Sequence, residues 1–155
     1  MNNPTTQSIT FDQEGSIFIS ATRKSKNCTV GLYGVPYDGT SSFRPGARFG
    51  PAAIRSVSQG LETYCPQLNK DLEEINFVDF GSVNIPFGAP EPIVKTVKLV
   101  TKKLIQLGLK PLLLGGEHSI ISGAIESIME YHSDLIVVQL DAHADLRNEW
   151  LGSNH

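Results

Sequence analysis

Short apolar segments alternate with longer amphipathic ones from residue 28 onward. The apolar segments are "CTVGLYGVP" (28–36), "INFVDFG" (75–81), "KPLLLGG" (110–116) and "DLIVVQLDAH" (134–143). Apolar residues such as Leu135 to Val138 follow one another without polar interruption, which is typical of strands covered on both faces in a parallel sheet. The pattern therefore predicts four buried strands in a mainly parallel sheet.

The segments between these strands have helical spacing. In "PIVKTVKLVTKKLIQLG" (92–108) the apolar residues fall on one helical face and the lysines on the other; the apolar ones are Ile93, Val97, Val100, Leu104 and Leu107. Gly108 is placed to end this helix. A second helix is predicted in "SIISGAIESIMEYH" (119–132), and a third begins at Pro51, because proline is favoured in the first helical turn. Strands that alternate with helices predict an α/β layered domain with right-handed crossovers.

Composition narrows the class of protein. With 155 residues, 40% apolar and 19% charged, the chain reads as one globular domain. Residues 1–27 are polar and mixed, and we expect them to form a loosely held N-terminal arm ahead of a domain at 28–155.

A net charge of −3 argues against nucleic-acid and anionic-membrane partners. The N-terminus does not resemble a signal peptide, no apolar run approaches the roughly 20 residues of a membrane span, and the two cysteines form no disulfide framework. We expect a cytoplasmic protein.

Polar loops follow three of the predicted strands. They are "YDGTSSFRPGARFG" after the first, "GGEHS" after the third and "DAHAD" after the fourth. Because ligands of parallel sheets gather at the carboxyl ends of the strands, these loops should converge on one edge of the sheet.

Asp141, His143 and Asp145 form the densest polar cluster in the chain. In an extended chain, side chains two residues apart point the same way, so the spacing aims these three groups at one place. Acidic groups after a buried strand need partners, and carboxylates with an imidazole suit a divalent ion such as Mn²⁺, Fe²⁺ or Zn²⁺. His118, after the neighbouring strand, is the natural fourth ligand. Glu117 is interpreted as a solvated or ion-paired carboxylate rather than a ligand.

These four residues can hold one metal ion. A two-metal centre needs on the order of ten coordination positions, of which four residues with one bridge fill about half. The residues alone leave two alternatives, a mononuclear site or a chain that lacks further ligands.

The chain resembles the ureohydrolase (arginase/agmatinase) family, and most closely its agmatinase-like branch. Three stretches carry the resemblance: "GVPYDGTSSFRPGARFGPAAIR" (34–55), "LLLGGEHSI" (112–120) and "LDAHADLRNEW" (140–150). The match covers residues 28–155 and implies a three-layer α/β/α fold with a mainly parallel sheet. Family members are roughly twice as long. A third motif with two further aspartates and a late glutamate are absent, so we interpret the chain as the N-terminal half of such an enzyme.

The resemblance also implies roles for individual residues. His118, Asp141 and Asp145 would hold one Mn²⁺. Asp141 would act in catalysis by bridging to a second Mn²⁺, which His143 helps to hold. His155 lies near the position of a proton-relay histidine in the family; the alternative is an exposed terminal residue.

The implied reaction is the hydrolysis of a guanidinium group to urea and an amine, with water activated between two metal ions. The stretch "LRNEWLGSN" (146–154) looks agmatinase-like, so the resemblance favours agmatine over arginine. Guanidinobutyrate, guanidine and arginine stay open as substrates. Arg147 and Glu149 either shape the substrate mouth or pair with each other at the surface. The complete enzyme is expected to be a homo-oligomer in putrescine and polyamine biosynthesis.

Two other interpretations stay open. With half of the ligands absent, the 155-residue chain alone is expected to bind metal weakly and to be inactive, so it could instead be a truncated, non-catalytic paralogue that binds a partner. A zinc deacetylase of related fold is disfavoured, because its His-rich motif is missing.

Overall fold

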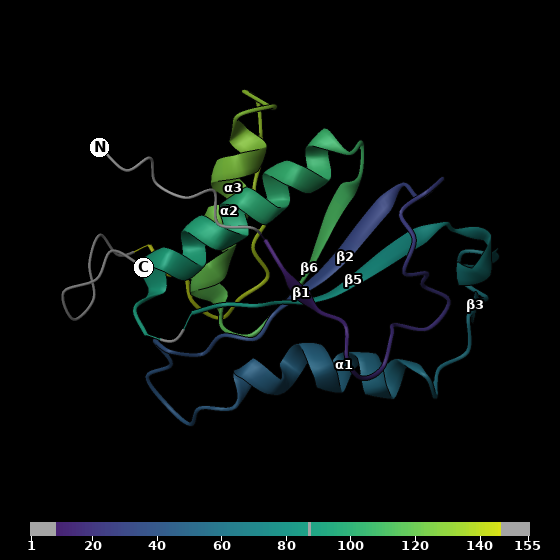
Figure 1. Cartoon of the computed structure of the whole chain (residues 1–155), viewed down its shortest axis with the longest axis horizontal. Helices are drawn as coiled ribbons and strands as arrows, with labels where there is room; N and C mark the ends of the chain where they lie inside the picture. Colours follow the sequence, from purple (N-terminus) through teal and green to yellow (C-terminus); the bar gives the residue numbers. More distant parts are fainter. Residues whose placement is uncertain (1–8, 87, 147–155) are drawn as a thin grey trace.

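A computed structural model describes residues 9–86 and 88–146 of the chain and contains a four-stranded sheet (Figure 1). Its strands are β1 (Phe11–Asp12), β2 (Val30–Val35), β5 (Phe77–Val83) and β6 (Lys110–Gly115), in the order β1-β5-β2-β6. Strands β5, β2 and β6 are parallel, and β1 is antiparallel to β5. The first three strands predicted from the sequence are therefore confirmed.

Helices cover both faces of this sheet, which gives the predicted three-layer α/β/α architecture. Helices α2 (Pro90–Gln106) and α3 (Ile121–Met129) lie together on one face, and α1 (Gly50–Ser58) lies on the other (Figure 1). The smaller elements are η1 (Ala47–Phe49), β3 (Tyr64–Cys65), β4 (Lys70–Asp71), η2 (Leu72–Glu74) and η3 (His118–Ile120). None of the described helices combines the length and the apolar character that crossing a bilayer requires.

Helix α2 supplies much of the core through the apolar face that the sequence predicts. Ile93, Val97, Val100 and Leu104 are buried against the sheet. Leu107, expected on the same face, is 56% exposed, because the helix ends at Gln106 and Leu107 is its C-cap. Gly108 follows with a φ of 76°, a left-handed conformation that glycine adopts easily and that stops the helix as predicted.

A buried ion pair joins α1 to the sheet. Asp79 of β5 is fully buried and accepts hydrogen bonds from Nε and Nη2 of Arg55 at 2.8 and 2.9 Å. Burial alone would raise the pKa of Asp79. The guanidinium and the backbone N–H groups of Phe18 and Gly81 outweigh this effect and hold the pKa below its usual value. The carboxylate therefore stays charged inside the protein.

The N-terminal arm is not loose over its described part. β1 pairs with β5, Thr22 forms a bridge with Val78, and the N–H of Ile19 donates to Oγ of Ser58 at 3.0 Å. The expectation failed because a polar composition describes side chains, whereas the arm is held by its backbone hydrogen bonds to a sheet edge. Residues 1–8 lie outside the described residues.

The fourth predicted strand, at 134–143, is not present. This segment has no strand pairing, and its apolar side chains Ile136, Val138 and Leu140 are between 80% and 96% exposed. An apolar run becomes a strand only where another strand accepts its backbone hydrogen bonds, and no described strand pairs with this segment. The prediction from hydrophobicity alone was therefore wrong for this segment.

Candidate metal centre

The carboxyl ends of β2 and β6 meet at one edge of the sheet, as the sequence predicts. Val35 lies opposite Gly115, the N–H of Gly116 donates to the carbonyl of Val35 at 3.0 Å, and that of Glu117 donates to the carbonyl of Tyr37 at 2.8 Å. A Cβ at Gly116 would collide with the carbonyl oxygen of Tyr37. Glycine is therefore required there because the two loops touch.

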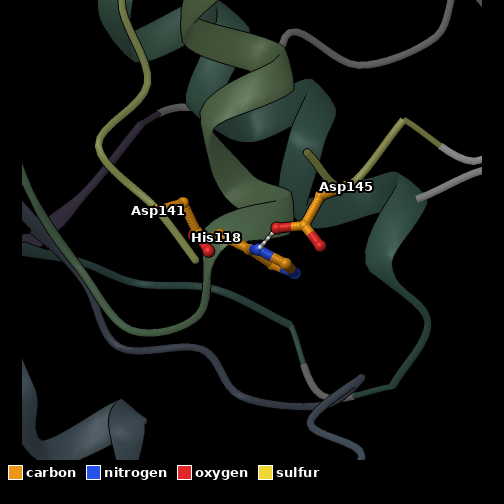
Figure 2. Close-up of side chains that lie close together, drawn as sticks. All are labelled: His118, Asp141 and Asp145. Carbon is orange, nitrogen blue, oxygen red and sulfur yellow. Dashed lines mark ion pairs between the residues drawn. The ribbon is translucent and has the colours of Figure 1, made fainter. Parts of the chain in front are cut away.

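Three potential metal ligands converge at this edge (Figure 2). Nδ1 of His118 lies 2.9 Å from Oδ2 of Asp145, and Asp141 offers an oxygen to the same cluster. One donor atom from each of the three side chains lies within 4.8 Å of the other two. The structure thus brings together three of the four residues that the sequence singles out as ligands.

A turn, rather than an extended strand, brings the two aspartates together. Oδ1 of Asp141 accepts a hydrogen bond from the N–H of His143 at 2.9 Å, and Asp145 has a φ of 51°. Asp tolerates this left-handed conformation better than most residues. The expectation that alternate side chains point the same way assumed an extended chain. It does not hold here, because the backbone bends between 141 and 145.

His143 lies outside the three-residue cluster. Its side chain is 82% exposed, and its Nδ1 lies 3.9 Å from Oδ1 of Asp141. It lines a shallow hollow of about 410 Å³ together with Asp141. His143 as a ligand of a second metal therefore stays a prediction. His155, Arg147 and Glu149 lie outside the described residues.

The donor set of the cluster suits a divalent cation. Two carboxylates and one imidazole are ligands for hard or borderline ions. Two donors that each lie about 2.2 Å from one ion are about 3.1 Å apart at right angles and at most about 4.4 Å apart, so three donor atoms within 4.8 Å of one another need only small side-chain adjustments. The N–H of His143 lowers the pKa of Asp141, and its effect exceeds the opposing effect of desolvation. The residues therefore fit one metal ion.

Asp38 closes the loop that borders this centre, a role that the sequence analysis missed. The residue is buried, its Oδ2 accepts hydrogen bonds from the N–H groups of Gly46 at 2.7 Å and Arg48 at 3.2 Å, and its Oδ1 lies 2.5 Å from the Arg48 guanidinium. The Arg48 side chain and these N–H groups hold the pKa of Asp38 at about 2. The only hint in the sequence is the turn-forming pair Asp38–Gly39.

Comparison with known proteins identifies the family of the chain that carries this site. The family model described as "Arginase family" matches residues 28–155. The chain belongs to the arginase family. An agmatinase of Bacillus anthracis is 40% identical over 144 residues, which cover 92% of this chain and 50% of that relative. The N(1)-aminopropylagmatine ureohydrolase of Thermococcus kodakarensis is 39% identical over 77% of this chain and 41% of its own length.

Solved structures give the same arginase-family fold. The agmatine ureohydrolase of Thermoplasma volcanium superposes with a TM-score of 0.81 at 31% identity, over 88% of this chain and 45% of that one. The chain spans about half the length of the curated agmatinases that it matches.

Proposed function

We propose that the full-length protein hydrolyses a guanidino compound, with agmatine as its first candidate substrate and urea and putrescine as products. The observation that carries the proposal is the cluster of His118, Asp141 and Asp145 at the carboxyl edge of an arginase-family sheet. The relatives' names support the substrate class, because they include agmatinases and a ureohydrolase of an agmatine derivative.

His118, Asp141 and Asp145 would hold a divalent metal ion, for which Mn²⁺ is the family-based candidate. When bound, such an ion lowers the pKa of water and so supplies hydroxide near neutral pH. The chain's own carboxylates offset the positive charge of the ion and of a cationic guanidinium substrate. Both aspartates must be ionised for this role, and the lowered pKa of Asp141 is consistent with that state.

His143 and His155 complete the proposal. His143 would help to hold a second ion, shared through Asp141, once its exposed side chain turns toward the cluster. His155 would relay a proton to the leaving amine, which is a poor leaving group unless it is protonated. A cytoplasmic location and a homo-oligomeric state accompany this proposal as expectations from the resemblance.

The test is urea release by the full-length protein with added Mn²⁺. Agmatine, N(1)-aminopropylagmatine, guanidinobutyrate, guanidine and arginine are compared under the same conditions, and we expect agmatine to have the highest kcat/KM. Variant Asp145→Asn keeps the size of the side chain but removes one charged ligand, and it should abolish most of the activity. Glu62→Gln, which changes an exposed carboxylate in the same way, serves as the matched control.

The other outcomes separate the alternatives. Turnover of another guanidino compound but not agmatine would reject the substrate while keeping the reaction. Stable expression of the 155-residue chain by itself, with a bound partner and no turnover, would favour the truncated, non-catalytic paralogue. Metal analysis adds a further check, because a single Zn²⁺ would indicate the deacetylase-like alternative. The 155-residue chain assayed alone is expected to release little urea.

A further inference from the structure

The Glu117 carboxylate accepts several hydrogen bonds next to the candidate metal centre. Glu117 lies in the turn between β6 and η3, directly before His118, and its side chain is half-buried. Its carboxylate accepts hydrogen bonds from the N–H of Thr40 at 3.0 Å, from the hydroxyl of Thr40, from Oγ of Ser41 at 3.4 Å and from the hydroxyl of Ser119. Among the ion pairs of residues 9–86 and 88–146, none involves Glu117.

These hydrogen bonds connect two loops that are far apart in the sequence. Thr40 and Glu117 are 77 residues apart. The backbone contact between Glu117 and Tyr37 joins the bases of the loops, and the Glu117 side chain joins their outer parts. Asp38 fixes the other end of the same loop, at Gly46 and Arg48. The loop from 38 to 48 is therefore held at both ends by carboxylates, and one of them is adjacent to the metal cluster.

The Glu117 carboxylate also constrains the backbone on both sides of His118. The residues on either side of His118 are Glu117 and Ser119, and the two side chains are hydrogen-bonded to each other. The His118 side chain itself is 64% exposed, so packing does not determine its orientation. The direction of its imidazole depends on its contact with Asp145 and on the backbone between 117 and 119, which Glu117 holds against Thr40.

We propose that Glu117 is a positioning residue for the metal centre, which fixes the turn that carries His118 by anchoring it to the loop at Thr40 and Ser41. It acts through His118 and is not itself a ligand, since its oxygens are used by hydroxyl and N–H donors. Residues that orient a metal ligand typically change metal affinity by about 10- to 100-fold when they are mutated. Only the expected effect of Glu117 on kcat rests on the proposed function; its effect on metal binding does not.

The experiment measures Mn²⁺ binding by calorimetry and hydrogen exchange of residues 38–46 in the full-length protein. Glu117→Ala should lower Mn²⁺ affinity by about tenfold or more and speed exchange in this loop. Thr40→Val removes one hydroxyl donor without changing any charge, and it should produce the same two effects more weakly. Glu62→Gln should leave both unchanged.

Distinct outcomes would overturn the inference. Unaltered Mn²⁺ affinity in Glu117→Ala would do so directly. Reduced affinity with unaltered loop exchange would indicate that Glu117 acts by charge or as a ligand, which also contradicts positioning. If Glu117→Ala does not fold, Thr40→Val decides in the same way, and no effect on either measurement would reject the proposal.

Neither readout requires a substrate, so these results stand apart from the proposed reaction. Failure of the full-length protein to hydrolyse any guanidino compound would reject the proposed function and leave the binding and exchange results valid. Where agmatine is hydrolysed, Glu117→Ala should lower kcat at limiting Mn²⁺ and recover part of it at saturating Mn²⁺.

Discussion

Removal of Arg55 should destabilise the protein by an amount that depends on pH. In Arg55→Met the aliphatic packing is largely kept, but the fully buried Asp79 retains only the N–H groups of Phe18 and Gly81 as donors. The carboxyl can avoid a buried charge by taking up a proton. At pH 7 this uptake costs about 4 kcal/mol, at 1.36 kcal/mol for each of roughly three pH units above its unfolded pKa. The two remaining donors reduce the cost, so we expect a loss of about 3 kcal/mol at pH 7.

The sign of the pH dependence follows from the pKa of Asp79. In the wild type this pKa is lowered, so the ion pair stabilises the fold above the unfolded pKa and is lost in acid. In Arg55→Met the pKa should instead be raised, so the penalty grows with pH and should shrink to about 1 kcal/mol near pH 5.

Urea denaturation followed by circular dichroism at both pH values measures this difference. In Arg55→Met/Asp79→Asn no charge remains at this buried pair, so this pH dependence should disappear and part of the stability should return. An equal loss for Arg55→Met at pH 5 and pH 7, or a loss below about 1 kcal/mol at pH 7, would refute the reasoning.

Further predictions concern the edge of the sheet that carries the site. His118→Ala should reduce Mn²⁺ affinity by about tenfold or more in calorimetry, whereas His132→Ala, at the far end of α3, should not change it. The low pKa of Asp38 stabilises its loop above about pH 4, so the protection of this loop against hydrogen exchange, corrected for the intrinsic rate at each pH, should fall as the pH drops toward about 2. Gly116→Ala should cost about 2 kcal/mol or more in urea denaturation, because its Cβ would meet backbone, whereas Gly60→Ala, with its nearest atom at 3.6 Å, should cost much less.

The sequence predicted the helices and strands whose buried faces follow from the spacing of apolar residues within each element. The apolar spacing of α2, from Ile93 to Leu104, matches the buried face, and Gly108 ends the helix as expected. The convergence of the loops after β2 and β6 also followed from topology, because parallel neighbours end at one edge. These features depend on residues close in sequence or on general rules of connection.

Features that depend on a distant partner were not predicted. The segment at 134–143 has the composition of a strand, but strand formation requires a neighbour that pairs with it. The attachment of the arm through β1 and Thr22 is carried by backbone groups that composition does not reveal. At the site, His118 lies beside Asp141 and Asp145, but the bend that leaves His143 outside this cluster depends on the hydrogen bond that Asp141 accepts.

The exposed segment between Asp134 and Asp141 should make the 155-residue chain prone to self-association at high concentration. Its sequence, "LIVVQL", carries no charge and no proline and is rich in β-branched residues, which is the signature of an aggregation-prone window. Charged residues beside such windows oppose self-association, and an aspartate lies at each end of this one. We therefore expect the charge of Asp141 to oppose self-association, in addition to the place of this residue in the metal cluster. Neutralising Asp141 should therefore promote aggregation as well as weaken metal binding.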